Sequence, residues 1–121
     1  MKNLLTNYPK RGEIFIADLN PPFGREIHKK RPVLVISNNI LNQVLPTVII
    51  IPFSSIVPEF IGPDMVKVNK QKGLDKSSTL IANQMRAIDR ERLVKRSGKL
   101  SKMDLEQVEE AMKIVLDLKE I

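Results

Sequence analysis

PVLVIS, residues 32–37, and TVIIIPFS, residues 47–54, are two runs of mostly apolar and β-branched side chains. β-Branched residues favour strands, and a run that is apolar at almost every position is typical of a strand buried on both faces. Residues 38–45, between the two runs, predict a helical turn. The two runs are therefore expected to be core strands, and the rest of the fold is predicted around them.

Shorter patterns on either side complete the predicted fold. A β-rich run covers residues 13–19, an alternating pattern predicts an edge strand at 65–68, and residues 78–88 predict one long, bent strand. Ser101 and Asp104 form a capping box before apolar residues that recur at steps of three and four, which predicts an amphipathic helix. Five strands and one C-terminal helix predict a mostly β, α+β fold, a small, strongly curved β-barrel closed by that helix. The connections are expected to be loops at residues 20–31 and 55–63, a turn at Gly73 and a helical turn at 89–94.

The composition excludes several kinds of site. The 121 residues are enough for one domain, predicted at residues 10–121 after an N-terminal tail at 1–9. Because the chain has no cysteine and one histidine, it lacks disulfides, thiolate zinc sites, a cysteine nucleophile and a multi-histidine metal site. Aromatic residues make up 4%, which argues against an aromatic stacking sheet. No apolar run has the length of a membrane span, and the N-terminus does not resemble a signal peptide.

The positive charge of the chain is unevenly distributed. The net charge is +6, and residues 61–100 alone hold ten basic and four acidic side chains, whereas residues 101–121 hold three and six. A basic body favours a polyanionic partner, although solubility alone also explains such a charge. Within this body, Lys95, Arg96 and Lys99 form either a face that attracts phosphate or a merely solvated one.

Polar side chains cluster at the ends of the two core runs. Glu26, His28, Lys29, Lys30 and Arg31 precede the first run, and Ser54 and Ser55 end the second. If the two strands pair in antiparallel fashion, Arg31 and Ser54 become neighbours. A guanidinium beside a hydroxyl suits a phosphodiester, because arginine offers forked donors to two phosphate oxygens.

This cluster could cleave RNA without a metal ion. The ribose 2′-OH would attack the adjacent phosphorus, Glu26 or another group would take its proton, and Arg31 would stabilise the phosphorane charge. Each residue also has an ordinary structural explanation. Arg31 and Glu26 could be solvated surface charges, Ser54 could bond to the backbone at a strand end, and His28 could be a general acid or a solvated loop residue.

The order of the motifs resembles one known family. Arg11-Gly12-Glu13-Ile14, Gly24-Arg25-Glu26 before Arg31-Pro32-Val33, and Pro46-Thr47-Val48 leading to Ser54-Ser55 follow one another along the chain. Asn83-Gln84-Met85-Arg86 and Arg92-Leu93 then precede the final helix. This series, over about residues 10–118, resembles the MazF/PemK toxin endoribonucleases of type II toxin–antitoxin systems.

The resemblance implies an SH3-like barrel, a homodimer, and cytoplasmic, metal-independent and cofactor-independent cleavage of single-stranded RNA at short sequences. It also implies a cognate antitoxin whose acidic, disordered tail occupies the RNA groove. Arg31 matches the catalytic arginine, Ser54 takes the place of the usual catalytic threonine, and Glu26 matches a glutamate beside the site. The residues expected to bind substrate are Gln84, Lys29, Lys30, His28 and Ser55.

The sequence departs from the family pattern in two places. The loop between Glu26 and Arg31 is often glycine-rich, but here it reads Ile27-His28-Lys29-Lys30, which adds positive charge. Some members carry an arginine and an aspartate where this chain has Ile81 and Asn83. That version of the acid–base chemistry cannot operate here, which leaves the identity of the base open.

Two other functions are compatible with the same fold. A gyrase-binding toxin of the CcdB kind shares the barrel, but the Arg31 and Ser54 pair and the absence of a C-terminal tryptophan argue against it. A non-catalytic nucleic-acid-binding barrel would also satisfy the charge.

Overall fold

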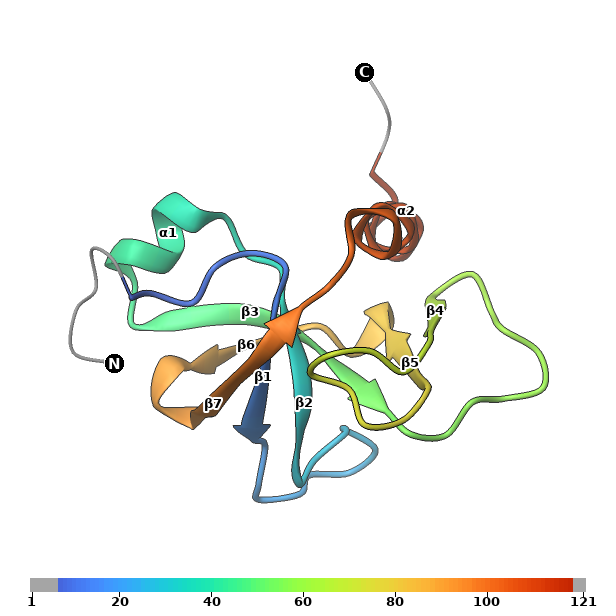
Figure 1. Cartoon of the computed structure of the whole chain (residues 1–121), viewed down its shortest axis with the longest axis horizontal. Coiled ribbons are helices and arrows are strands. Elements are labelled where there is room, and N and C mark those ends of the chain that lie inside the picture. Colours follow the sequence, from blue (N-terminus) through green and yellow to red (C-terminus); the bar gives the residue numbers. More distant parts are fainter. Residues whose placement is uncertain (1–6, 119–121) are drawn as a thin grey trace.

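The computed structural model describes residues 7–118, and seven strands, two α-helices and two 3-10 turns form the fold (Figure 1). The predicted tail at residues 1–9 thus lies partly outside the described residues, which begin at Asn7. The elements in chain order are β1 (Glu13–Asp18), β2 (Lys30–Val35), α1 (Asn39–Val44), β3 (Thr47–Ser54), β4 (Met65–Val68), β5 (Ser78–Ile81), η1 (Ala82–Gln84), β6 (Arg86–Asp89), η2 (Arg90–Arg92), β7 (Leu93–Lys99) and α2 (Lys102–Leu116).

The strands form one antiparallel, strongly curved sheet. The hydrogen-bonded order is β4-β5-β3-β2-β1-β7, and β6 pairs with the first half of β3. The predicted α+β class, with a curved sheet and a C-terminal helix, is confirmed. The sheet is open, however, because β4 and β7 end its path and do not pair with each other.

Alternate residues of the central strands are buried in two separate clusters. Ile14, Leu34 and Ile51 belong to the cluster on one face of the sheet. Phe15 and Ile50 belong to the cluster on the other face. Because successive side chains of a strand point to opposite faces, a strand covered on both faces must be apolar throughout. This accounts for the two continuous apolar runs.

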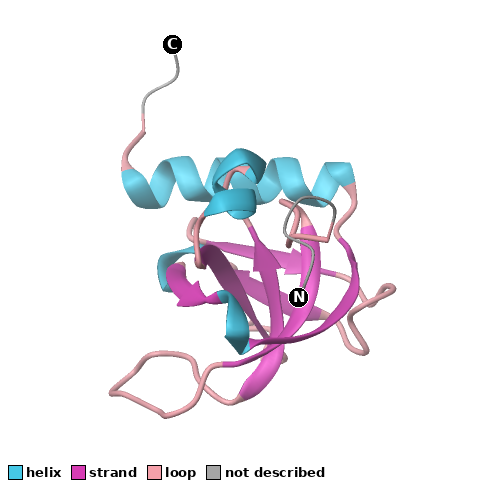
Figure 2. Ribbon diagram, turned by 90° about the vertical axis from the view of Figure 1, so that its left-hand side faces the viewer, coloured by secondary structure: helices cyan, strands magenta, loops and turns pink. Residues whose placement is uncertain are grey.

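The C-terminal helix covers the first of these clusters. Figure 2 shows α2 lying across the top of the curved sheet. The backbone N–H of Asp104 donates to the Ser101 hydroxyl at 3.2 Å, so the predicted cap is confirmed. Val108 and Ala111 are buried against the sheet, whereas Met103 and Ile114 on the same helix are exposed. No helix of residues 7–118 is both long and apolar enough to cross a membrane.

The prediction of five strands was wrong in two places. The expected continuous strand at 78–88 is interrupted by η1. On β3, Ile50 pairs with Arg86 and Phe53 pairs with Leu80. The chain therefore advances three residues along β3 but six residues along its partner, and η1 contains the three extra residues. β7 was missed altogether, because its sequence, LVKRSGK, is polar and contains glycine. Pairing with β1 forms this strand.

Gly73, in the turn between β4 and β5, contacts Gly98 of β7. A Cβ atom on Gly73 would lie 3.1 Å from the Cα atom of Gly98, and a Cβ atom on Gly98 would collide with the carbonyl of Lys72. Gly73 also has a φ of +95°, a left-handed backbone conformation that residues with a side chain rarely adopt. The turn between β4 and β5 therefore packs backbone to backbone against β7.

Candidate active site

A basic cleft lies where β2 begins and β3 ends. Its volume is about 500 Å³, and the residues before β5 form its other wall. Its apolar floor includes Ile16, Pro32 and Phe53. The polar residues that line it are Lys29, Lys30, Arg31, Ser55, Asp75, Lys76 and Ser78.

Arg31 is held in this cleft by two backbone carbonyls. Its Nε atom donates to the carbonyl of His28 at 2.6 Å, and its Nη1 atom donates to the carbonyl of Phe53 at 3.3 Å. Burial lowers the pKa of the Arg31 guanidinium from its ordinary value, but arginine remains charged at neutral pH. None of the ion pairs within residues 7–118 involves Arg31. The cleft thus contains a partly desolvated cation whose charge no carboxylate neutralises.

The end of β3 comes next to Arg31, as the antiparallel pairing requires. Val33 pairs with Pro52 and Leu34 with Ile51, and beyond these pairs the Arg31 side chain reaches the carbonyl of Phe53, the residue before Ser54. Ser54 is buried, and its hydroxyl accepts a hydrogen bond from the backbone N–H of Ile56 at 3.2 Å. Ser55, rather than Ser54, lines the cleft.

The loop that carries Glu26 is anchored by side chains from elsewhere in the fold. Gln84 accepts a hydrogen bond from the backbone N–H of Ile27 at 3.3 Å, and Arg92 donates to the carbonyl of Asp18 at 3.0 Å. The Glu26 side chain is exposed and is not among the residues that line the cleft. Gln84 is therefore hydrogen-bonded to this loop, and the carbonyl of His28 is hydrogen-bonded to Arg31.

The wall formed by residues 73–78 was not predicted from the sequence. Gly73 was predicted as a turn and no functional role was predicted for Asp75, Lys76 or Ser78, although all of them line the cleft. Asp75 is the one carboxylate among the lining residues. Little in the local sequence identifies this wall, because the contact of Gly73 with Gly98 brings it to the cleft.

The acidic and imidazole groups do not gather into a metal site. Within the described residues, no three histidine, cysteine, aspartate or glutamate side chains lie close enough to hold a metal ion. The arrangement combines cations, hydroxyls and one carboxylate, which can bind a phosphodiester and transfer protons.

Comparison with known proteins shows which family has a similar sequence. A family model described as a PemK-like, MazF-like toxin of type II toxin–antitoxin systems matches residues 10–116. Endoribonuclease EndoA of Bacillus subtilis is 36% identical over 110 residues, which are 90% of this chain and 95% of that protein.

Solved structures have the same fold. MazF from Deinococcus radiodurans superposes with a TM-score of 0.81 at 23% identity, over 93% of this chain and 99% of that one. A chain of the MazE–MazF complex from the same organism gives a TM-score of 0.74 at 22% identity, over 93% of this chain and 100% of that one.

Proposed function

The chain belongs to the PemK-like, MazF-like family of toxins of type II toxin–antitoxin systems, and we propose that it is an endoribonuclease that cleaves single-stranded RNA in the cytoplasm. The observation that carries the proposal is a guanidinium free of ion pairs, among the described residues, beside the end of β3 in a basic cleft. The absence of cysteine suits a reducing compartment.

The reaction needs no group from outside the protein and its substrate. The 2′ oxygen of one nucleotide forms a bond with the adjacent phosphorus while a base takes its proton, and Glu26 is the residue we propose for that base. The bond from phosphorus to the 5′ oxygen of the next nucleotide breaks, and a protonated group assists its departure. The products are a 2′,3′-cyclic phosphate and a 5′-hydroxyl, and DNA resists because it lacks the 2′-OH.

Each site residue has a proposed part in this reaction. Arg31 stabilises the charge on the phosphorane, because a partly desolvated cation interacts strongly with an anion. Ser54, whose hydroxyl accepts the backbone N–H of Ile56 in the turn after β3, is proposed to offer that hydroxyl to the phosphate. The proposed substrate-binding residues are Lys29, Lys30 and Ser55, which line the cleft, together with His28 and Gln84.

Cleavage in the presence of a chelator tests the proposal. The purified protein is incubated with a long, unstructured RNA in EDTA, and the 5′ ends and terminal phosphates are mapped. Cleavage at a short recurring sequence, with cyclic phosphate and 5′-hydroxyl ends, is the expected result. Cleavage that EDTA stops and Mg²⁺ restores would contradict it.

The proposed partners follow from two surfaces. The basic cleft suits the acidic, disordered tail of a cognate antitoxin. Ile40 and Val44 of α1 are 72% and 70% exposed, and Ile49 of the adjacent β3 is also exposed. Such an apolar face is typical of an interface, and a second copy of the chain is its proposed occupant.

Sedimentation velocity tests the homodimer. At micromolar concentration, the species is expected to have twice the 13.8 kDa mass of the chain. Replacing Ile40 and Val44 by glutamate should shift it to the monomer, since the charges would have to be buried without partners. A wild-type protein that sediments as a monomer would contradict the proposal.

A further inference from the structure

A second cleft lies on the other side of the turn between β4 and β5. Its volume is about 480 Å³, close to that of the first cleft. It has two lysines, one arginine and one carboxylate. The residues that line it are Glu13, Lys72, Arg96, Ser97, Gly98 and Lys99.

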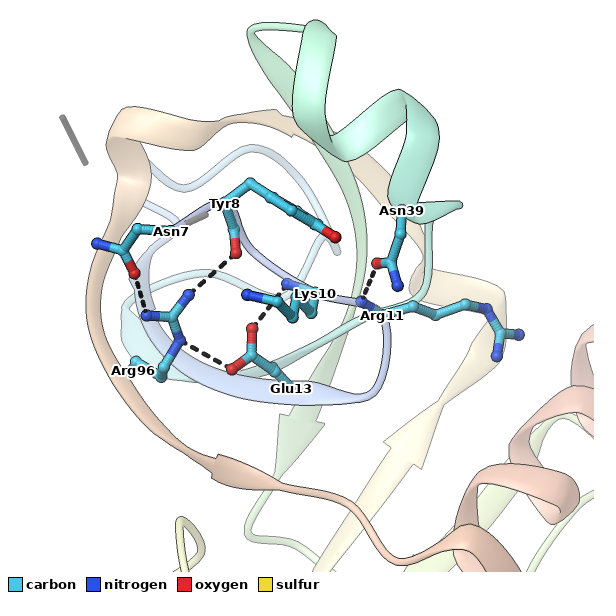
Figure 3. A network of polar contacts seen from close by, with 7 residues as sticks. All are labelled: Asn7, Tyr8, Lys10, Arg11, Glu13, Asn39 and Arg96. Carbon is cyan, nitrogen blue, oxygen red and sulfur yellow. Dashed lines mark hydrogen bonds and ion pairs between the residues drawn. The ribbon is translucent and has the colours of Figure 1, made fainter. Parts of the chain in front are cut away.

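Contacts within the protein occupy the arginine of this cleft. The Nε atom of Arg96 lies 2.8 Å from the carboxylate of Glu13. Its Nη1 and Nη2 atoms donate to the side chain of Asn7 at 2.7 Å and to the carbonyl of Tyr8 at 3.0 Å. Figure 3 shows these partners surrounding the guanidinium. Arg96 and Glu13 therefore neutralise each other and hold the N-terminal segment in place.

The two lysines of the second cleft are Lys72 and Lys99. Lys72 and Lys99 are exposed, and neither takes part in an ion pair within the described part of the chain. Because Glu13 is committed to Arg96, the second cleft carries about two positive charges without counter-charges. Exposed lysines act as point charges that suit phosphate groups.

The two clefts share one low wall. Lys72 precedes Gly73, which lines the first cleft, and Lys99 follows Gly98, which lines the second. The wall is the contact between these two glycines, which have no side chains of their own. A single polyanionic strand could thus pass from one cleft to the other without meeting a side chain at this contact.

We propose that the second cleft binds phosphates of the RNA strand whose cleavage site occupies the first cleft. This subsite rests on the proposed ribonuclease function and extends it. Lys72 and Lys99 neutralise phosphates away from the scissile bond, so they strengthen the binding of long substrates and have no part in the chemistry. An acidic peptide is the competing occupant, but the shared wall favours a strand that continues from the first cleft.

A double variant, Lys72→Gln with Lys99→Gln, tests the subsite. The matched control is Lys67→Gln with Lys102→Gln, which removes the same charge from two exposed lysines outside both clefts. The substrates are a long unstructured RNA and a short oligonucleotide that spans only the mapped cleavage sequence. Binding is measured with the same RNAs carrying a 2′-deoxy sugar at the cleavage position.

The test variant is expected to have a KM for the long RNA about tenfold above that of the wild type. Its kcat, and its KM for the short oligonucleotide, should stay nearly unchanged. Each phosphate contact on a single strand contributes about 0.7 to the slope of log affinity against log salt concentration, so two lost contacts reduce the slope by about 1.4. The control variant is expected to retain most of its affinity and a slope near that of the wild type.

Three results would overturn the subsite. The test variant could bind the long RNA as tightly as the control variant does, or it could lose the same affinity for the short and the long RNA. A poly-glutamate peptide could instead lose affinity while RNA does not, which would assign the cleft to an acidic peptide. Since the binding assay uses RNA that cannot be cleaved, it separates failure of the subsite from failure of the ribonuclease proposal, which the EDTA assay reports.

Discussion

Replacement of Arg31 by alanine is expected to lower kcat/KM for RNA cleavage by about 10³-fold, the upper range for losing one donor to a developing oxyanion. The guanidinium has five N–H donors, and the carbonyls of His28 and Phe53 engage two of its nitrogens. These bonds set its orientation in the cleft and leave other donors for a phosphate. The variant removes both the charge and this geometry.

Two companion variants separate the role of Arg31 from general effects of charge. Arg31→Lys keeps the charge without the forked donors, so it should recover only a small part of the activity. Lys30→Ala removes a neighbouring exposed cation and should mainly raise KM. Because Arg31 is only partly buried, the melting temperature of Arg31→Ala should remain close to that of the wild type. Full cleavage by Arg31→Ala would show that the assignment is wrong.

Replacement of Glu26 by glutamine is expected to lower kcat about 10²-fold or more, with a small change in KM, because it removes a general base while nearly preserving shape. The carboxylate lies on the loop that Gln84 and Arg92 anchor. Arg31 also binds this loop through the carbonyl of His28. The loop thus links the proposed base to the Arg31 guanidinium.

Asp75 provides the matched control, because it is the carboxylate that lines the cleft. Asp75→Asn changes the same functional group in the wall of the cleft and tests the competing carboxylate, so kcat stays near the wild-type value if Glu26 is the base. Single-turnover cleavage of one RNA by both variants makes the comparison. If Asp75→Asn loses the activity and Glu26→Gln keeps it, the role of base passes to Asp75.

Local patterns predicted most of the secondary structure. β3 occupies residues 47–54 and β4 occupies 65–68, as expected, and Ser101 caps the final helix. These elements depend on β-propensity, alternation and capping, which act within a few residues. β7 could not be recognised in the same way, because its polar sequence becomes a strand only through pairing with β1.

The candidate site was predictable in part. Antiparallel pairing of the two apolar runs was enough to predict Arg31 at the end of β3, where its side chain donates to the carbonyl of Phe53. The sequence left open whether Ser54 and Glu26 have catalytic or ordinary structural roles, and it could not choose between them. Ser54 turned out to bond to the backbone, Ser55 to line the cleft, and Glu26 to lie outside the lining, because these details depend on how each loop is anchored.

The amino-acid sequence alone determined the core strands, the final helix and the motif order that resembles a toxin family, since each is encoded in neighbouring residues. Only the tertiary structure decided the far wall of the cleft, the second cleft beside it and the orientation of the Arg31 guanidinium. Gly73 and Gly98 meet across the open ends of the sheet, and Arg31 takes its direction from carbonyls on two separate segments. The contacts of Gly73 with Gly98 and of Arg31 with Phe53 join residues that are distant along the chain, so no local pattern can encode them.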